Sequence, residues 1–393
     1  MSARKKPASK RRLRIPDCKH FTGYKPCFPG TDCLDECVDP KPRGTRILIV
    51  NLEAMGNVLV TTTLLPPTKR KYPRSSVSWI TLKNAVRLLD GNPYLDRVYE
   101  WNPESWLKLG AMKFDVVMNV DKSVASCSLA MALQSKKKLG YGLNPDGVIV
   151  PLNTEAEENY RLGLNDELKF RVNRKSNSRL LTEAVGLKFR RDEYVLNLSA
   201  EEQSFCAAFR QSILHPPGNG SEPSPELIVG LNTGCSLLYP NKKLTVDQHV
   251  VLICELAKRK NIRVLLLGGP EDTMRNAEIQ RQAGTLAVST PTEEGLRRGL
   301  CYVNVCDVVI SGDSFGMHAA IGLKKHVIVW FGVSCPQEID LFDRGIKLIP
   351  EGLACSPCWK RECPYDLECI QMVDLEKIVG EVDAFCSKKA VAG

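Results

Sequence analysis

The feature that most constrains the fold is an alternation of short apolar segments with helical segments, which the chain runs through twice. In the first half, strands are predicted at 46–52, 76–82, 97–101 and 115–120, with helices at 58–73 and 85–91. In the second half, strands are predicted at 227–234, 262–269, 307–313 and 326–332, with a helix at 246–260, one after Pro270 and one before the last strand. This βαβ pattern is typical of parallel sheets with helices on both faces. It predicts an α/β protein of two Rossmann-like, doubly wound domains facing a central cleft.

Composition sets the expected boundaries. The stretch "HPPGNGSEPSPE" is dense in Pro, Gly and Ser and is typical of a linker. Pro66 and Pro67 are expected to kink or shorten the first helix. The predicted organisation is a basic tail at 1–16, a Cys-rich segment at 17–44, an N-terminal domain at 45–214, a linker at 215–226 and a C-terminal domain at 227–393.

The charge is concentrated at the start of the chain. The formal net charge is +9, and seven uncompensated Lys and Arg residues lie within the first sixteen positions, which leaves +2 for the rest. A tail of this kind is usually solvated, and it can also contact anionic lipid. The near-neutral remainder disfavours a nucleic-acid-binding protein. With no signal-peptide pattern and no long uncharged apolar run, we expect a cytoplasmic protein, with peripheral contact to the inner membrane face left open.

Half of the sixteen cysteines fall into two groups of four. The second group contains Cys-Ser-Pro-Cys, the two-residue spacing that lets two sulfurs reach one ion, and is the stronger signal. Zinc is the favoured metal and iron the alternative, and four thiolates would make either site structural rather than catalytic. Local structural stapling without catalysis is the plainer interpretation of both groups. The first group lacks the close pair, and His20 is a possible substitute ligand there. The candidate ligands are Cys18, Cys27, Cys33 and Cys37, and Cys355, Cys358, Cys363 and Cys369.

Short polar turns follow three strands of the second half: "NTGCS" at 232–236, "GGPED" at 268–272 and "GDSFGMH" at 312–318. Turns that open helices present backbone N–H groups and the positive end of the helix dipole to anions. They suit a pyrophosphate group, although each alone is weak evidence because such turns occur throughout α/β proteins.

Taken in order, "ILIVNLEAMGNVLVTTTLL", "GNPYLDRVYEW", "GLNTG", "GGPED" and "GDSFGMHAAIGLKKHVIVWFG" resemble glycosyltransferase family 9, the heptosyltransferase-like enzymes of the GT-B fold. The resemblance covers roughly residues 45–382, and "CSPCWKREC" is similar to a segment found in many members. It implies a C-terminal domain that binds a nucleotide sugar, with ADP-heptose the best-known donor. It also implies an N-terminal domain that receives a glycan or lipid-linked acceptor, inversion at the anomeric carbon, and no catalytic metal.

The resemblance assigns donor-binding residues by position. Asp313 and Ser314 match the pair that opens the donor-binding helix, and Met317 and His318 match the Met-His one turn later. Gly316 follows Phe315 where many members have Gly-Pro, which puts the shape of the pocket in doubt. A lysine after the Asn-Thr-Gly strand would offset charge on the leaving diphosphate. The remaining candidates are Lys242 or Lys243 for that lysine, Thr233 in the turn, and Glu271 for the ribose.

The turn after the first strand departs from the family. Members usually have Gly-Asp there, and that aspartate is taken as the general base, whereas this chain has Asn57. A carboxamide can orient a hydroxyl but cannot accept its proton. Glu53, four residues earlier, is the nearest substitute, against the plainer interpretation of a solvent-facing carboxylate. The leading hypothesis is therefore an inverting glycosyltransferase, and the alternative is a catalytically impaired nucleotide-sugar-binding or scaffold protein.

Overall fold

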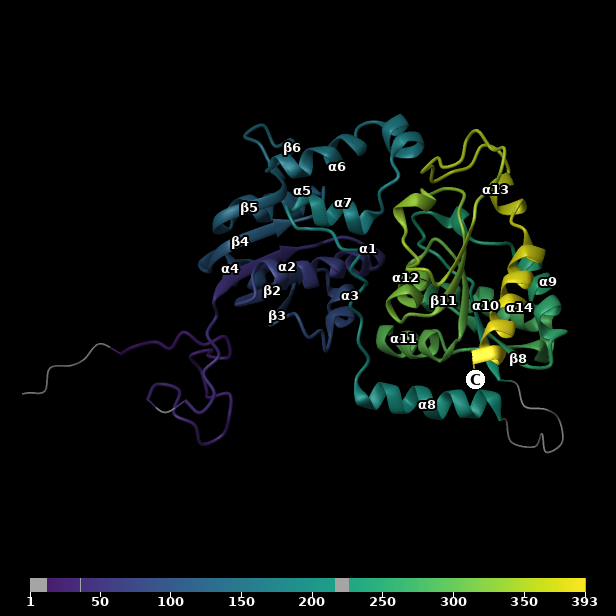
Figure 1. The fold of residues 1–393 in the computed structure, drawn as a ribbon, viewed down its shortest axis with the longest axis horizontal. Helices are drawn as coiled ribbons and strands as arrows, with labels where there is room; N and C mark the ends of the chain where they lie inside the picture. Colours follow the sequence, from purple (N-terminus) through teal and green to yellow (C-terminus); the bar gives the residue numbers. More distant parts are fainter. Residues whose placement is uncertain (1–12, 36, 216–225, 393) are drawn as a thin grey trace, which may run out of the picture.

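The computed structural model describes residues 13–35, 37–215 and 226–392. Most of the predicted basic tail and of the predicted linker lies outside these described residues. From Thr45 onward the described residues form two α/β domains side by side, and the described residues before Thr45 form an irregular segment next to the first domain (Figure 1). The predicted fold class is confirmed.

The first domain is built on a six-stranded sheet in the order β3-β2-β1-β4-β5-β6. All neighbouring strands are parallel except the pair of β5 and β6, which is antiparallel. The central strand is apolar on both faces, as a parallel sheet covered on both sides requires. The strands are β1 (Thr45–Val50), β2 (Ser75–Thr81), β3 (Arg97–Glu100), β4 (Lys113–Asn119), β5 (Gln134–Leu143) and β6 (Ile149–Pro151).

The second domain repeats this topology with six strands that are all parallel. Its order, β12-β11-β10-β7-β8-β9, is the same doubly wound arrangement when read from the first strand of the domain. The strands are β7 (Leu227–Asn232), β8 (Ile262–Leu267), β9 (Ala287–Ser289), β10 (Val308–Gly312), β11 (His326–Trp330) and β12 (Gly345–Leu348).

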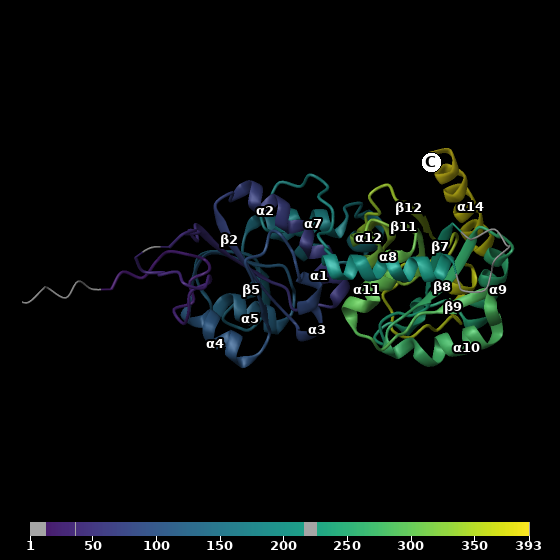
Figure 2. The ribbon, with the colours of Figure 1, turned by 90° about the horizontal axis from the view of Figure 1, so that it is seen from below.

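Helices cover both faces of each sheet, as Figures 1 and 2 show. Pro66 and Pro67 fall in the first turn of a new helix, so the predicted first helix is divided by a 3₁₀ turn. The helices of the first domain are α1 (Met55–Thr61), α2 (Leu65–Lys71), α3 (Lys83–Val86), α4 (Pro103–Ala111), α5 (Val124–Ala132), α6 (Glu157–Leu162) and α7 (Asn177–Ala184). The later helices are α8 (Ala200–Leu214), α9 (Val246–Ala257), α10 (Thr273–Ala283), α11 (Leu296–Val305), α12 (Phe315–Gly322), α13 (Glu368–Gln371) and α14 (Leu375–Ala392).

Helix α8 belongs to the second domain by its packing, although the predicted domain boundary places it in the first. The predicted boundary at residue 214 places α8 in the N-terminal domain, but α8 packs against α11 of the second domain. Phe209 of α8 meets the Tyr302 ring edge-on at 5.0 Å, and Arg210 pairs with Asp307 at 2.8 Å. The chain therefore crosses between the domains before α8 rather than at the linker.

The two domains share a continuous apolar core. One buried cluster contains Ile47 and Leu59 of the first domain together with Met317 and Phe331 of the second. Apolar contact of this kind resists separation of the domains, because opening them exposes the buried surface to water. Within the described residues, no helix has the length and apolar character needed to cross a lipid bilayer.

Candidate active site

The site is built where each sheet reverses its strand order. In doubly wound sheets, the loops at this point splay apart and leave room for a ligand beyond the carboxyl ends of the strands. In the second domain the reversal lies between β7 and β10, and in the first between β1 and β4. The polar residues that the sequence singled out follow three of these four strands.

The turn between β10 and α12 is held open by an asparagine. Asn232, the last residue of β7, donates from Nδ2 to Ser314 Oγ at 3.0 Å and to the Gly234 carbonyl at 2.9 Å. A Cβ on Gly316 would lie 2.4 Å from Asn232 Oδ1, so only glycine permits this approach. Ser314 makes no side-chain capping bond to α12. The first backbone N–H groups of α12 are consequently available to an anion.

Lys242 is the lysine that faces this helix end. Its Nζ lies 2.7 Å from Asp313 Oδ2, and both side chains are nearly buried, at 12% and 11% exposed. Burial alone would raise the pKa of Asp313, but attraction to Lys242 outweighs it and holds that pKa below its ordinary value. The Trp330 indole N–H donates to the Lys242 carbonyl at 2.9 Å and fixes the backbone. Lys243 instead lies toward Asp272 and Cys235. Burial raises the pKa of both groups, and the positive charge of Lys243 offsets part of that rise.

The first turns of α1 and α12 touch across the domain interface. A Cβ on Gly56 would lie 2.6 Å from His318 Cδ2, so the turn that carries Asn57 lies beside α12. His318 is 7% exposed and its Nδ1 lies 3.2 Å from Tyr194 Oη. Burial lowers the pKa of His318 to about 4, so the ring is neutral near pH 7 and acts as a hydrogen-bonding group rather than a cation.

A buried aspartate supports the turn that carries the candidate bases. Asp121, two residues beyond β4, is 3% exposed and accepts from Asn51 Nδ2 at 2.6 Å and from the Leu52 backbone N–H. Burial, with a contribution from the negative charge of Glu53, raises the pKa of Asp121 to about 8. Glu53 is half-buried and Asn57 is exposed. Asp121 is therefore mostly protonated and neutral at pH 7, and Glu53 is the more accessible of the two acidic side chains.

This arrangement predicts an unusual pH dependence of stability. The pKa of Asp121 is about 8 in the folded protein and about 4 in an unfolded chain, so the folded state binds the proton more tightly. Its contribution to the free energy of unfolding is full below about pH 4 and is lost as the pH rises through about 8. We expect Asp121→Asn to gain stability over wild type between pH 5 and pH 8 in urea unfolding. The variant amide can still bond Asn51, whose buried Oδ1 has no hydrogen-bond partner among the described residues.

Asp115→Asn is the matched control for this experiment. Hydrogen bonds from the Arg46 backbone N–H and from Lys136 lower the pKa of Asp115. Its contribution to the free energy of unfolding is therefore present above about pH 4 and is lost only in more acidic solution, the opposite of Asp121. The difference between this variant and wild type should stay flat from pH 5 to pH 8. Parallel curves for wild type and Asp121→Asn would show that Asp121 is ionised throughout.

The remaining predicted donor-site residues differ in burial: two are buried behind the site and one is exposed. The Thr233 hydroxyl turns inward to Asn276, and Met317 is fully buried in the core, so both shape the site from behind. Glu271 is exposed in the turn after β8, where its ribose contact stays a prediction.

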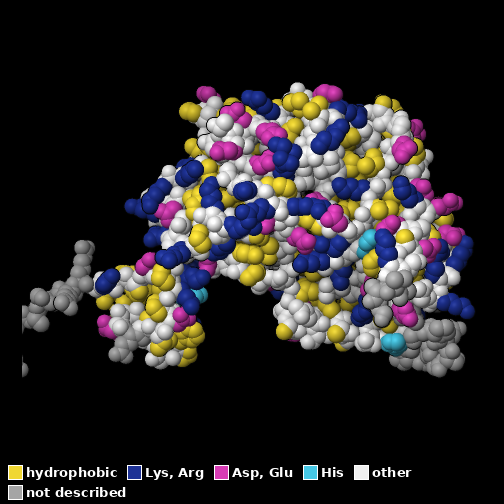
Figure 3. Space-filling view, in the orientation of Figure 1, with side chains coloured by type: hydrophobic (Ala, Val, Ile, Leu, Met, Phe, Trp, Pro, Cys, Tyr) yellow, Lys and Arg dark blue, Asp and Glu magenta, His cyan; other side chains and the backbone are white. Residues whose placement is uncertain are grey.

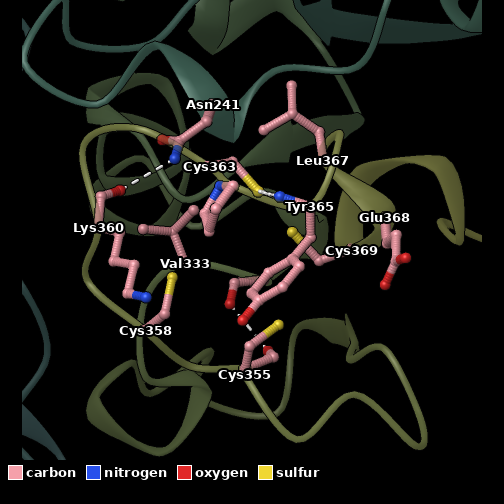
Figure 4. Close-up of a pocket in the computed structure, with 13 residues that line it drawn as sticks. Asn241, Val333, Cys355, Cys358, Lys360, Cys363, Tyr365, Leu367, Glu368 and Cys369 are labelled. Carbon is pink, nitrogen blue, oxygen red and sulfur yellow. Dashed lines mark hydrogen bonds between the residues drawn. The ribbon is translucent and has the colours of Figure 1, made fainter.

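The second cysteine group gathers around one small space. Cys355, Cys358, Cys363 and Cys369 line a cavity of about 20 Å³, shown in Figure 4. Burial and the three neighbouring thiols raise the pKa of Cys369 to about 11. No three candidate ligands in the described ranges are arranged closely enough to hold a metal ion. In the first group Cys18 is buried while Cys27 is exposed.

Several residues of the site lie in segments whose local sequence pattern does not indicate a functional role. Asp121 lies in a segment that reads as an ordinary loop, and Tyr194 lies in an irregular crossover more than a hundred residues before its partner His318. Asn232 was the exception, because the last polar residue of a strand at the reversal point is a recognisable position.

Comparison with known proteins agrees with this geometry. Residues 104–368 match glycosyltransferase family 9 (heptosyltransferase). The lipopolysaccharide core heptosyltransferase OpsX of Haemophilus influenzae is 21% identical over 291 residues, which cover 70% of this chain and 75% of that protein.

Two solved structures share the fold. The glycosyl transferase family 9 protein of Veillonella parvula has a TM-score of 0.66 and 15% identity, covering 86% of this chain and 96% of that one. The E. coli ADP-heptose lps heptosyltransferase II has a TM-score of 0.61 and 16% identity, covering 88% and 100%. The chain belongs to glycosyltransferase family 9, the heptosyltransferase family, and is a glycosyltransferase.

Proposed function

We propose that this enzyme transfers a heptose from ADP-heptose to a saccharide acceptor of the lipopolysaccharide type, with inversion at the anomeric carbon. The observation that carries the proposal is the Lys242–Asp313 pair beside the open first turn of α12, in contact with α1 of the acceptor domain. The donor and the acceptor class are supported by the names of the similar heptosyltransferases.

The proposed mechanism divides the work between the domains. The N–H groups at the start of α12 bind the diphosphate, and the Lys242 ammonium offsets the charge that grows on it as the glycosidic bond breaks. The acceptor hydroxyl attacks the anomeric carbon from the opposite face and gives its proton to a base on the first domain. Glu53 is that base in our proposal, because it is the accessible carboxylate in the turn that carries Asn57. Asn57 orients the hydroxyl through its amide.

Donor turnover tests the proposal directly. The purified chain is incubated with ADP-heptose, UDP-sugars or GDP-sugars, with and without a bacterial glycan and lipid extract, and the released nucleotide is quantified. We expect acceptor-dependent release of ADP from ADP-heptose. Binding of ADP-heptose without turnover on any acceptor would favour the impaired binding protein, and failure to bind any nucleotide sugar would reject both.

We also propose that the second cysteine group holds a structural zinc or iron ion. Four sulfur side chains line one small space, and thiolate sulfur is the donor type that these metals prefer. No three of them lie close enough to hold an ion in the structure, so binding would require the loop to draw them together. Burial first, and then the three neighbouring thiols, raise the pKa of Cys369, and a bound cation would favour the thiolate form. The ion would fix the loop and take no part in sugar transfer. Metal binding by the first group stays a prediction.

Elemental analysis checks the metal. We expect about one zinc or iron per chain after purification without chelator, with visible absorbance if the metal is iron. Cys358→Ser should lose most of this metal, whereas Cys254→Ser, an exposed cysteine on α9, should keep it. Equal metal content in the two variants would place the ion elsewhere.

The environment of the enzyme also remains a proposal. We place the reaction in the cytoplasm, with the basic tail as a contact to the membrane that carries a lipid-linked acceptor. On the face shown in Figure 3, Lys and Arg are interspersed with Asp and Glu, so this face offers no broad single-sign surface for nucleic acid.

A further inference from the structure

The loop that carries the second cysteine group bridges the two domains at the site. We call residues 353–369 the cysteine loop. From the first domain, Arg171 donates to the carbonyl groups of Ser356 at 3.0 Å and Ala354 at 2.7 Å. From the second domain, Asn241 donates to the Lys360 carbonyl at 2.9 Å, a bond drawn in Figure 4. Asn241 immediately precedes Lys242, so the loop is joined directly to the diphosphate-facing segment.

Trp359 is the side chain of this loop that reaches both domains. Lys242 Nζ lies 5.0 Å from the centroid of the indole ring, and Lys169 Nζ, from the first domain, lies 4.6 Å from it. Tyr239 meets the same indole edge-on at 5.5 Å, with its own centroid 5.2 Å from Lys242 Nζ. An ammonium over an aromatic face is attracted by the ring quadrupole, more strongly where water is displaced.

The backbone of Trp359 is held in an unusual conformation by hydrogen bonds to a neighbouring segment. Trp359 has φ of 50°, the left-handed region that bulky residues rarely adopt. Its N–H donates to the Val333 carbonyl at 2.9 Å, as does that of Cys358 at 3.0 Å, which fastens the turn to the segment after β11. Strained conformations of this kind persist where the surrounding contacts determine them, and they cluster at functional sites.

We propose that Trp359 is a positioning residue of the donor site. Its indole holds the Lys242 ammonium in the direction of the diphosphate and ties the first domain to the same ring through Lys169. Asp313 lies 2.7 Å from the ammonium, and the Trp359 ring, from a different segment of the chain, supplies a second attraction to it. The cysteine loop is thus a wall of the donor site. The inference rests on the proposed function, because it assumes that Lys242 acts on a nucleoside diphosphate.

Two substitutions separate the role of the ring from simple packing. Trp359→Phe keeps an aromatic face, whereas Trp359→Leu keeps apolar bulk without one. We expect Trp359→Leu to raise the Kd for ADP, measured by calorimetry on the full chain, by about 5- to 30-fold. In turnover it should raise the donor KM more than it lowers kcat. Trp359→Phe should stay within about threefold of wild type. Trp106→Leu, a half-exposed tryptophan on α4, is the matched control and should change nothing.

A second measurement covers the case in which Trp359→Leu disturbs the loop. Lys169→Met leaves the loop sequence intact and removes one cation from the ring, and it should raise the Kd for ADP by about two- to fivefold. A double-mutant cycle of Trp359→Leu with Lys242→Met should show that the two losses are not additive, because each removes the same contact.

The outcomes are distinguishable. Equal Kd values for the leucine variant and wild type, or equal losses for the leucine and phenylalanine variants, would overturn the role of the ring while wild-type ADP binding upheld the donor site. Additive losses in the cycle would do the same. Failure of the wild-type chain to bind ADP would reject the proposed donor, and the positioning role with it.

Discussion

Lys242→Met should lower kcat/KM for the nucleotide-sugar donor by about 100- to 1,000-fold, the usual cost of removing one preorganised charge donor from a transition state. The Lys242 ammonium lies 2.7 Å from Asp313 at the end of α12, where the leaving diphosphate is proposed to bind. Without it, the nearly buried carboxylate of Asp313 faces the diphosphate unopposed. Steady-state kinetics with ADP-heptose measure the loss.

Two further variants decide what causes that loss. Lys243→Met removes the adjacent lysine, which lies toward Asp272, and should stay within about threefold of wild type. Lys242→Met combined with Asp313→Asn removes the buried carboxylate charge as well. If the ammonium acts on the diphosphate, the double variant stays slow although its thermal stability recovers. Recovery of activity in the double variant, or an equal loss in Lys243→Met, would contradict the assignment.

Strand positions were predictable because burial on both faces forces continuous apolar runs. The strands at β1, β7, β8 and β11 lie within about two residues of the predicted ranges, and Leu48 and Ile49 are buried on opposite faces of one sheet. The position of α8 was not predictable from its own sequence. Its apolar residues show that it packs, but its partner, α11, lies far along the chain, with Arg297 of α11 bonded to Glu202 of α8 across 95 positions.

The site was predictable to the extent that backbone topology determines it. Polar turns after β7 and β10 must converge because the strands pair, and Ser314 with Asn232 shows this. The choice between Lys242 and Lys243 depended on side-chain direction, which adjacent residues of one type do not reveal. Asp121 and Trp359 depended on contacts with segments distant in the chain, and no local pattern encodes those contacts.

In the proposed mechanism, the neutral Asp121 lets a turn without the usual aspartate carry Glu53 as the base. Burial disfavours the charged form of a carboxyl group, and a nearby negative charge adds to this effect, so the pKa of Asp121 rises to about 8. Asp121 takes the buried position and accepts hydrogen bonds from Asn51 and Leu52, and Glu53 keeps the accessible one. The turn after β1 is thereby braced by a residue that does not compete for the acceptor proton.

Glu53→Gln should therefore lower kcat by about 100- to 10,000-fold, the range in which general-base catalysis contributes, with little change in the donor KM. The glutamine keeps the size of the side chain and loses the ability to accept a proton. Glu104→Gln, an exposed carboxylate in the first turn of α4, is the control and should keep full activity. Full activity of Glu53→Gln would show that another group accepts the proton.

Asn57→Asp in the Glu53→Gln background gives the sharpest result. Asn57 is exposed in the first turn of α1, next to the Gly56–His318 contact, so a carboxylate there faces the same interface. We expect the double variant to recover a large part of kcat, because the new aspartate replaces the lost base at the position that the family uses. Turnover by Asn57→Asp alone, with an inactive wild type, would instead show that the native turn binds the acceptor without a base. No recovery in the double variant would mean that Glu53 acts by shaping the turn rather than by accepting the proton.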